Sequence, residues 1–210
     1  MAALIVGASG LAREVLPLLR ERAIEPIGVL DDRHAQLGGT YAGLPLLGGI
    51  DDVVAHAGTD LVLCVGSSPG RAAVRARLEA LGVEESRYLT VVDPSVRNPA
   101  GCPIGAGSIL FAGVVLTADV SMGASVVAMP NVIFTHDCVI DEGATFAGGV
   151  SLGGSVHVGQ NAYLGMNATV LPGRAIGRGA VVGMGAVVLS DVPDGETWAG
   201  VPARSLGGQS

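Results

Sequence analysis

The chain has 210 residues, of which 49% are hydrophobic, only 15% are charged and 33 are glycine. All 12 basic residues are arginine, which excludes Schiff-base chemistry, a lysine general base and a lysine-containing phosphate loop. The net charge of −7 argues against nucleic acid or an anionic membrane as the main partner and favours a small molecule or a protein.

The first 92 residues read as an α/β domain of Rossmann-like type. A glycine turn at 7–10 leads into an amphipathic helix over 11–22, which Pro17 is expected to bend or shorten, and a second glycine turn at 66–70 precedes an arginine-rich helix. The predicted strands cover residues 4–6, 26–30, 61–65 and 88–92. Strands that alternate with helices in this way predict βαβ units and a parallel sheet.

Two glycine turns and an acidic pair fall at the carboxyl ends of these strands. Ligands of parallel α/β sheets bind at that edge, where backbone N–H groups and a helix N-terminus meet a phosphate. The candidate substrate-binding residues are therefore Gly7, Ser9, Gly10, Asp31, Asp32 and Gly66. Only GxxG of the fingerprint GxGxxG is present, so plain structural turns stay open as the alternative, as does a cap or turn role for the two aspartates.

A six-residue repeat governs the second half of the chain. Every sixth residue from Ile104 to Val188 is apolar, and four residues after each of these the chain is usually small or β-branched, with Arg174 as the misfit. This period fits neither a helix nor an alternating strand and is the signature of a parallel β-helix. With three hexads per triangular coil, residues i and i+18 lie one above the other.

The repeat sets the domain limits and explains the composition. We assign residues 1–92 to the Rossmann-like domain, 93–195 to the β-helix and 196–210 to a C-terminal tail. A narrow interior filled by stacked aliphatic side chains leaves room for few aromatics. Glycines one residue after the inward positions are expected to supply the corner conformations, namely Gly105, Gly123, Gly159, Gly165, Gly177 and Gly183.

Targeting and redox signals are missing from the sequence. The opening residues lack a basic segment, and no apolar run approaches the about 20 residues of a membrane helix, so we expect a cytoplasmic protein without a membrane partner. Cys64, Cys102 and Cys138 have no paired spacing and are interpreted as buried small residues.

His136 is the leading catalytic candidate, because it follows the inward Phe134 by two residues and should project outward. Histidine titrates near neutrality and can take a proton from an attacking amine or hydroxyl, and Asp137 would orient its ring. Gly154 lies 18 residues further, so its backbone N–H could meet an oxyanion; corner geometry is the alternative reason for this glycine. The alternatives are that His136 is an ordinary surface histidine and that Asp137 is a solvated turn residue.

Read together, the two halves resemble the hexapeptide-repeat sugar acetyltransferases of the sialic-acid O-acetyltransferase and bacillosamine-pathway N-acetyltransferase type. The resemblance covers nearly the whole chain. It rests on IVGASG at 5–10, DD at 31–32, HDCVI at 136–140, LPG at 171–173 and GVPAR at 200–204.

This resemblance implies a left-handed β-helix, a homotrimer, and acetyl-CoA bound between neighbouring prisms as the acyl donor, without a metal. It also implies transfer to the amine of a nucleotide-linked 4-amino-6-deoxy sugar held by the N-terminal domain, with His136 as the general base, Asp137 as its orienting partner and Gly154 as the oxyanion donor. The residues expected at the coenzyme are Thr145, Met166, Gly183, Met184, Gly200, Val201, Pro202 and Arg204.

Coenzyme phosphates would suit arginines near the C-terminal coils, and Arg174, Arg178 and Arg204 are the candidates, with solvated surface as the alternative for each. Arg174 occupies a nominally inward phase, so either the coil bulges there or the side chain escapes toward a ligand.

Three departures from the family pattern concern the substrates. Leu11 and Thr145 stand where relatives carry histidine, and Met129 replaces a frequent asparagine. They leave the nucleotide, the sugar and the choice between N- and O-transfer open.

Rival functions are a sialic-acid-type O-acetyltransferase and a non-catalytic trimeric scaffold that binds a nucleotide sugar. A zinc enzyme of the carbonic anhydrase type is not expected, because His136 and His157 are the β-helix domain's two histidines and do not form a close pair. Cys138 as a nucleophile is disfavoured by its inward phase.

Overall fold

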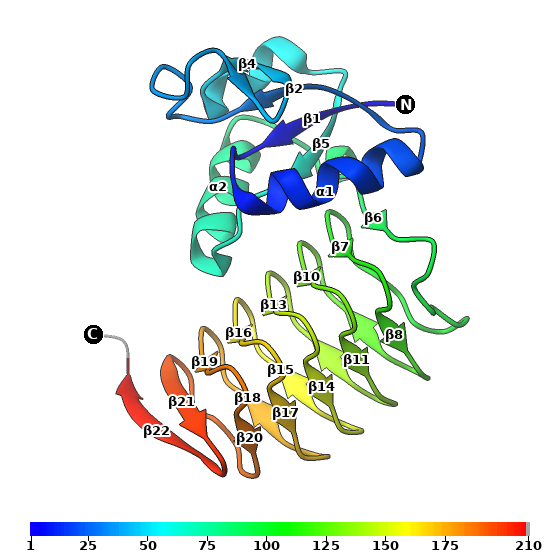
Figure 1. The fold of residues 1–210 in the computed structure, drawn as a ribbon, viewed down its shortest axis with the longest axis vertical. Helices are drawn as coiled ribbons and strands as arrows, with labels where there is room; N and C mark the ends of the chain where they lie inside the picture. Colours follow the sequence, from blue (N-terminus) through cyan, green and yellow to red (C-terminus); the bar gives the residue numbers. More distant parts are fainter. Residues whose placement is uncertain (209–210) are drawn as a thin grey trace. The chain divides into compact units, whose positions relative to one another are not determined.

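The computed structural model describes residues 1–208 and separates into two compact units between Val91 and Val92. Figure 1 shows an α/β unit at the N-terminal end of the chain and a stack of coils at the C-terminal end.

The first unit is a five-stranded sheet in the order β3-β4-β2-β1-β5 with two helices. Strands β1, β2, β4 and β5 are parallel to one another, and β3 is antiparallel to β4. The elements are β1 (Ala2–Val6), α1 (Gly10–Glu21), β2 (Glu25–Leu30), β3 (Thr40–Tyr41), β4 (Leu44–Gly48), the 3-10 helix η1 (Ile50–His56), β5 (Asp60–Leu63), α2 (Ser68–Ala80) and the 3-10 helix η2 (Glu85–Arg87). The predicted Rossmann-like βαβ arrangement is confirmed.

Two details of this unit differ from the sequence prediction. The strand predicted at 88–92 does not join this sheet: Tyr88 makes a single parallel bridge with Leu61, and the following β6 (Val91–Val92) belongs to a sheet of the second unit. The short β3–β4 hairpin was not predicted, because β3 has only two residues and β4 contains proline and glycine.

Helix α1 begins where its sequence predicts and is not shortened by proline. The Ser9 hydroxyl caps it by accepting the N–H of Ala12 at 3.4 Å and also donates to the Cys64 carbonyl at 2.6 Å. Pro17 lies on the exposed face, and the helix continues to Glu21. The opposite face is buried and includes Val15 and Leu19, both fully inaccessible.

The second unit is a left-handed parallel β-helix with three sheets. Its strands are β7 (Ile109–Leu110), β8 (Val115–Leu116), β9 (Ser121–Met122), β10 (Val127–Ala128), β11 (Ile133–Phe134), β12 (Val139–Ile140), β13 (Thr145–Phe146), β14 (Ser151–Leu152), β15 (His157–Val158), β16 (Tyr163–Leu164), β17 (Thr169–Val170), β18 (Ala175–Ile176), β19 (Val181–Val182), β20 (Val187–Val188), β21 (Glu196–Gly200) and β22 (Ala203–Gly208). The sheets run β22-β21-β19-β16-β13-β10-β7-β6, β20-β17-β14-β11-β8 and β18-β15-β12-β9.

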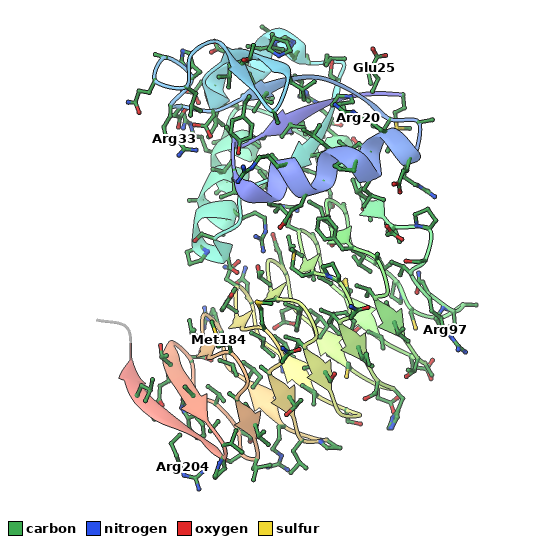
Figure 2. The ribbon with its side chains drawn as sticks, in the orientation of Figure 1. Arg20, Glu25, Arg33, Arg97, Met184 and Arg204 are labelled. Carbon is green, nitrogen blue, oxygen red and sulfur yellow. The ribbon has the colours of Figure 1, made fainter. Side chains whose placement is uncertain are left out.

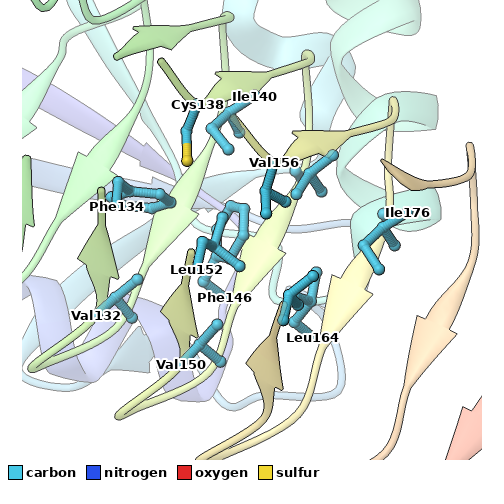
Figure 3. Close-up of a cluster of buried hydrophobic side chains, with 14 of the residues drawn as sticks. Val132, Phe134, Cys138, Ile140, Phe146, Val150, Leu152, Val156, Leu164 and Ile176 are labelled. Carbon is cyan, nitrogen blue, oxygen red and sulfur yellow. The ribbon is translucent and has the colours of Figure 1, made fainter. Parts of the chain in front are cut away.

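The predicted stacking of residues 18 apart is confirmed by the strand register. Phe134 pairs with Leu116 on one side and with Leu152 on the other. Every inward position from Leu110 to Val188 is at most 4% exposed, and Ile104 is partly buried against the same core. Figure 3 shows these side chains filling the interior, where Phe134 and Phe146 meet edge to face with centroids 4.9 Å apart.

The glycine assignment at the corners is corrected by the structure. The left-handed backbone falls three residues after each inward position, at every sixth residue from Gly107 to Gly185, with φ between 51° and 75°. The glycines predicted to do this, such as Gly159 and Gly165, have ordinary φ values. They are needed because a Cβ at Gly159 would lie 2.7 Å from the Arg178 backbone nitrogen in the next coil.

Residues 196–208, predicted as a tail, continue the β-helix. Strand β21 pairs parallel with β19, and β22 returns antiparallel to β21. Residues 201–202 form the turn between them, with Gly200 at φ 96°.

The cysteine prediction is confirmed: Cys64, Cys102 and Cys138 are free thiols and buried. No helix within residues 1–208 is both long and apolar enough to span a bilayer.

Candidate active site

His136 and Asp137 lie on the corner between β11 and β12. The His136 Nδ1 is 2.7 Å from an Asp137 carboxylate oxygen, and both side chains are well exposed, at 64% and 59%. An ionised carboxylate only accepts hydrogen bonds, so Nδ1 is the donor in this contact, and in the neutral imidazole Nε2 then keeps its lone pair. The arrangement therefore presents a free basic nitrogen at the surface of the β-helix.

Gly154 lies in the next coil, directly against the imidazole. A Cβ at this position would overlap Cε1 and Nε2 of His136 and lie 3.0 Å from Nδ1. The backbone of Gly154 is not left-handed, so corner geometry does not explain the glycine. The glycine is needed because it leaves space for the His136 ring. Its amide N–H has no acceptor among residues 1–208.

This cluster can perform proton transfer next to an oxyanion. A nucleophile placed near Nε2 would lose its proton to the imidazole, and the Asp137 carboxylate would stabilise the imidazolium that forms. The Gly154 N–H is a backbone donor of the kind that stabilises a tetrahedral intermediate. The three catalytic candidates are thus brought together.

The residues predicted for the coenzyme fall mostly at the C-terminal end of the β-helix. Met166 and Met184 occupy the same corner in adjacent coils, and both are exposed, at 55% and 77%. Gly183 donates its N–H to the Trp198 carbonyl at 2.8 Å. Figure 2 shows Met184 and Arg204 on the outside of this end.

The other coenzyme candidates are divided between this end and the middle of the sheet. Thr145 lies on β13, outside the end cluster, and is 6% exposed. It belongs to an outward-facing row that continues through Tyr163 and Val181 to Thr197 of β21. The structure places the remaining candidates, Gly200, Val201 and Pro202, in the turn between β21 and β22.

The three arginine candidates are held by the chain itself. Arg174 lies 3.6 Å from Asp191, and its guanidinium leaves the inward phase and is partly exposed, although its Nε is buried without a hydrogen-bond partner within residues 1–208. Arg178 lies 3.6 Å from Asp194, and Arg204 donates to the Ala203 carbonyl. Of the two explanations for Arg174, the structure favours escape of the side chain.

In the first unit, the glycine turn is built around close backbone approach. Gly7 has φ 104°, and a Cβ there would lie 2.7 Å from the Cys64 carbonyl oxygen. Gly10 begins α1 with open space around its Cα, and Gly66 is equally unobstructed. The buried Arg71 donates a hydrogen bond to the Val65 carbonyl at 2.8 Å. This bond stabilises the second glycine turn, at residues 66–70.

Asp31 is an internal brace of this turn. Its carboxylate accepts the Ala8 N–H at 2.7 Å and is bound by both the backbone and the guanidinium of Arg33 at 2.8–3.0 Å. Burial alone raises the pKa of Asp31, but the hydrogen bonds from Arg33 and Ala8 outweigh it and hold the pKa below its ordinary value.

We expect Asp31→Asn to lower the free energy of unfolding at pH 7 by about 1–3 kcal/mol, because charged hydrogen bonds to a buried carboxylate are lost. The Asp31 contribution is complete above the ordinary aspartate pKa and is lost as the pH falls through the lowered one, so wild type and variant should converge in acid. Urea titrations across pH test this. Asp32→Asn is the matched control, with a smaller expected loss because Asp32 is half exposed; equal losses would contradict the brace.

Asp32 faces a different neighbourhood from Asp31. It accepts the Ile50 N–H at 3.1 Å and pairs with Arg77 at 2.7 Å, and the hydrogen bond from Arg77 lowers its pKa. These contacts agree with the alternative role of Asp32 as a cap or turn residue.

Sequence reasoning missed two side chains at the glycine turn. Arg33 donates to the Ala8 carbonyl at 2.9 Å and remains 57% exposed, as its outward position in Figure 2 shows. The Tyr41 hydroxyl donates to the Ser9 carbonyl at 2.8 Å. The arginine directly after the acidic pair was a usable signal for the first; nothing local pointed to the second.

A separate groove of about 420 Å³ lies on the β-helix beside His157. His157 is exposed and pairs with Asp141 at 3.0 Å, as expected for a surface histidine. No group of three or more histidine, cysteine or acidic residues within the described part of the chain is placed to hold a metal ion.

Two family models match the chain. The PglD N-terminal domain covers residues 3–78, and the bacterial transferase hexapeptide, with six repeats, covers residues 155–190. The comparison with curated protein sequences found no significant match.

Solved structures match both units together. A variant of perosamine N-acetyltransferase from Caulobacter crescentus, in complex with CoA and GDP-perosamine, is 27% identical with a TM-score of 0.90, and the match covers 99% of this chain and 97% of that one. The acetyltransferase domain of PglB from Neisseria gonorrhoeae, in complex with acetyl coenzyme A, is 26% identical with a TM-score of 0.88 and 98% coverage of each chain. WeeI from Acinetobacter baumannii is 30% identical over 98% of this chain and 100% of its own, with a TM-score of 0.83.

Likeness along the full length, together with a carboxylate-oriented histidine on a hexapeptide β-helix, defines the protein as a two-domain acyltransferase of the hexapeptide-repeat class. Within that class the chain belongs to the family of nucleotide-amino-sugar N-acetyltransferases that these proteins represent.

Proposed function

We propose that this protein transfers the acetyl group of acetyl-CoA to the amine of a nucleotide-linked 4-amino-6-deoxy sugar, with His136 as the general base. The observation that carries the proposal is the His136 imidazole, oriented by Asp137 and lying against Gly154 with Nε2 free. The choice of an amine acceptor is supported by the Caulobacter enzyme, an N-acetyltransferase whose structure contains GDP-perosamine.

The reaction would proceed within one ternary complex, without a covalent enzyme intermediate. The sugar amine attacks the thioester carbonyl carbon while Nε2 of His136 takes a proton from the amine. The Gly154 N–H stabilises the oxyanion of the tetrahedral intermediate. Collapse of the intermediate breaks the carbon–sulfur bond, and the imidazolium returns its proton to the departing thiolate.

The remaining residues would bind the two substrates. We assign the pantetheine arm and phosphates to Thr145, Met166, Gly183, Met184 and the segment from Gly200 through Val201 and Pro202 to Arg204. The nucleotide sugar would meet Gly7, Ser9, Gly10 and Gly66. Asp31 and Asp32 stay candidates at the nucleotide, although their carboxylates also accept hydrogen bonds within the unit. Arg33, which is bonded to Asp31 and remains 57% exposed, is added to them.

We further propose that the working unit is a homotrimer and that the protein acts in the cytoplasm, where both substrates are available. The exposed apolar side chains of Ile133, Leu171 and Leu189, which lie on β11 and on corners stacked with that of His136, support a surface covered by another copy. Size-exclusion chromatography with light scattering distinguishes a trimer from a monomer.

The test of the reaction is thiol release from acetyl-CoA across UDP-, dTDP- and GDP-linked 4-amino sugars. Release with one of them, and mass-spectrometric detection of an amide product, is the expected result. Release only with hydroxyl acceptors such as sialic acids would replace N-transfer by O-transfer. If acetyl-CoA neither reacts nor raises the melting temperature, the protein is a scaffold and the proposal fails.

A further inference from the structure

One phase of the backbone hydrogen-bond ladder between the described coils is interrupted immediately before His136. In the regular pattern, the residue after each inward position donates its N–H to the carbonyl 17 residues later, as Thr117 does to Phe134 at 3.1 Å and Asp141 to Val158 at 2.8 Å. From Gly105 to Leu171 in the described coils, this bond is missing only at Thr135.

At Thr135 the side chain replaces the backbone. Its hydroxyl donates to the Leu152 carbonyl at 2.8 Å, the same acceptor that the regular ladder would use. At this point the two coils are therefore joined by the Thr135 side chain and not by its backbone N–H. The next residue along the chain is His136.

The acceptor side of this bond leads directly to Gly154. Leu152 precedes it by two residues, and the Cys138 thiol donates to the carbonyl of Gly153 at 3.3 Å. The thiol contact resembles that of Ser108 with the Gly123 carbonyl, 3.1 Å away at a corner without a histidine, so it is not specific to the His136 corner. The hydroxyl bond of Thr135 has no such counterpart at the other described corners.

We propose that Thr135 is a positioning residue for His136. By substituting its hydroxyl for the ladder bond, Thr135 holds the coil closed while the backbone turns far enough to lay the imidazole against Gly154. This inference rests on the proposed acetyl transfer with His136 as base. It adds a residue that touches neither substrate and acts only by fixing where the base sits.

The test compares Thr135→Val, Thr135→Ser and Thr117→Val in steady-state thiol release. Valine keeps the shape of threonine and removes the hydroxyl, so we expect kcat to fall about tenfold, equivalent to about 1.4 kcal/mol, with KM for both substrates unchanged. Serine restores the hydroxyl and should return kcat to within about twofold of wild type. Thr117→Val makes the same change one coil earlier, where the backbone bond is intact, and should leave kcat unchanged.

The melting temperature of each variant and its oligomeric state at the assay temperature are also measured. They distinguish a misplaced His136 from a loss of the fold. If Thr135→Val does not fold, Thr135→Ala carries the same expectation. A wild-type kcat in the folded valine or alanine variant, or an equal loss in the serine variant, would overturn the role of Thr135. His136→Ala is assayed in parallel. Full activity of His136→Ala would refute the proposed base and this inference together. An inactive His136→Ala beside a fully active Thr135→Val would refute the inference alone.

Discussion

Replacing His136 by alanine is expected to lower kcat by about 10²–10⁴-fold, the usual contribution of a positioned general base. The side chain is 64% exposed and its hydrogen bond runs to the equally exposed Asp137, so the variant should fold normally. Thiol release at saturating acetyl-CoA and sugar measures the loss. An unchanged KM for acetyl-CoA would show that binding is intact and that the chemical step has failed.

The β-helix supplies its own control for this experiment. His157 is also exposed and also paired with an aspartate, Asp141 at 3.0 Å, but it lies on a strand rather than at the His136 corner. His157→Ala should retain wild-type turnover. Should His136→Ala stay within about threefold of wild type, or both variants lose activity equally, the assignment of the base would be wrong.

The second large effect is expected from Gly154→Ala, with a fall in kcat of about 10²-fold. The added methyl group would occupy the space of the imidazole, and a displacement of about 1 Å at a reacting group is enough for a loss of this size. Because the Gly154 backbone is not left-handed, alanine should not strain the coil, and the melting temperature should change little.

A double-mutant cycle identifies how the alanine acts. If the methyl group works by displacing His136, Gly154→Ala should cost almost nothing further in a chain that already carries His136→Ala. Additive losses would instead indicate that the alanine disturbs the oxyanion donor or the coenzyme independently of the histidine. Full activity of the single variant would contradict the close contact of ring and glycine.

The β-helix could be predicted from the sequence because one physical requirement repeats in every coil. Interior side chains stack on their equivalents 18 residues later, so the six-residue period specified the register, as the pairing of Phe134 with Leu152 shows. The same period placed His136 outside and Gly154 beside it. For this part of the molecule, composition and phase contain nearly all the necessary information.

The separate reasons for glycine could not be predicted, because two of them occur within the same hexad, two residues apart. Close approach of the next coil requires glycine at positions such as Gly165, whereas left-handed backbone favours glycine at positions such as Gly173. A sequence shows the same residue in both cases. The bond of Thr135 was hidden for a similar reason, since a threonine in a strand-rich segment looks ordinary until its backbone partner is found missing.

In the α/β unit, long-range contacts decided what local patterns left open. The glycine turn and the Ser9 cap followed from the sequence, but the engagement of Asp31 by Arg33 and Ala8 depends on how two strand ends meet. Short strands such as those at Thr40–Tyr41 and Val91–Val92 carry too few residues for a pattern. Their partners in space, rather than their sequences, define them.

The left-handed corner backbone also restricts the chemistry of the site. Asp137 occupies the corner position with φ 60°, where asparagine, aspartate and glycine are tolerated far better than other residues. Asparagine or glycine there would suit the backbone but bring no negative charge to the imidazole, and glutamate would bring the charge but strain the backbone. Aspartate alone satisfies both demands, so in this architecture one residue both adopts the left-handed backbone of the corner and holds a carboxylate against the imidazole.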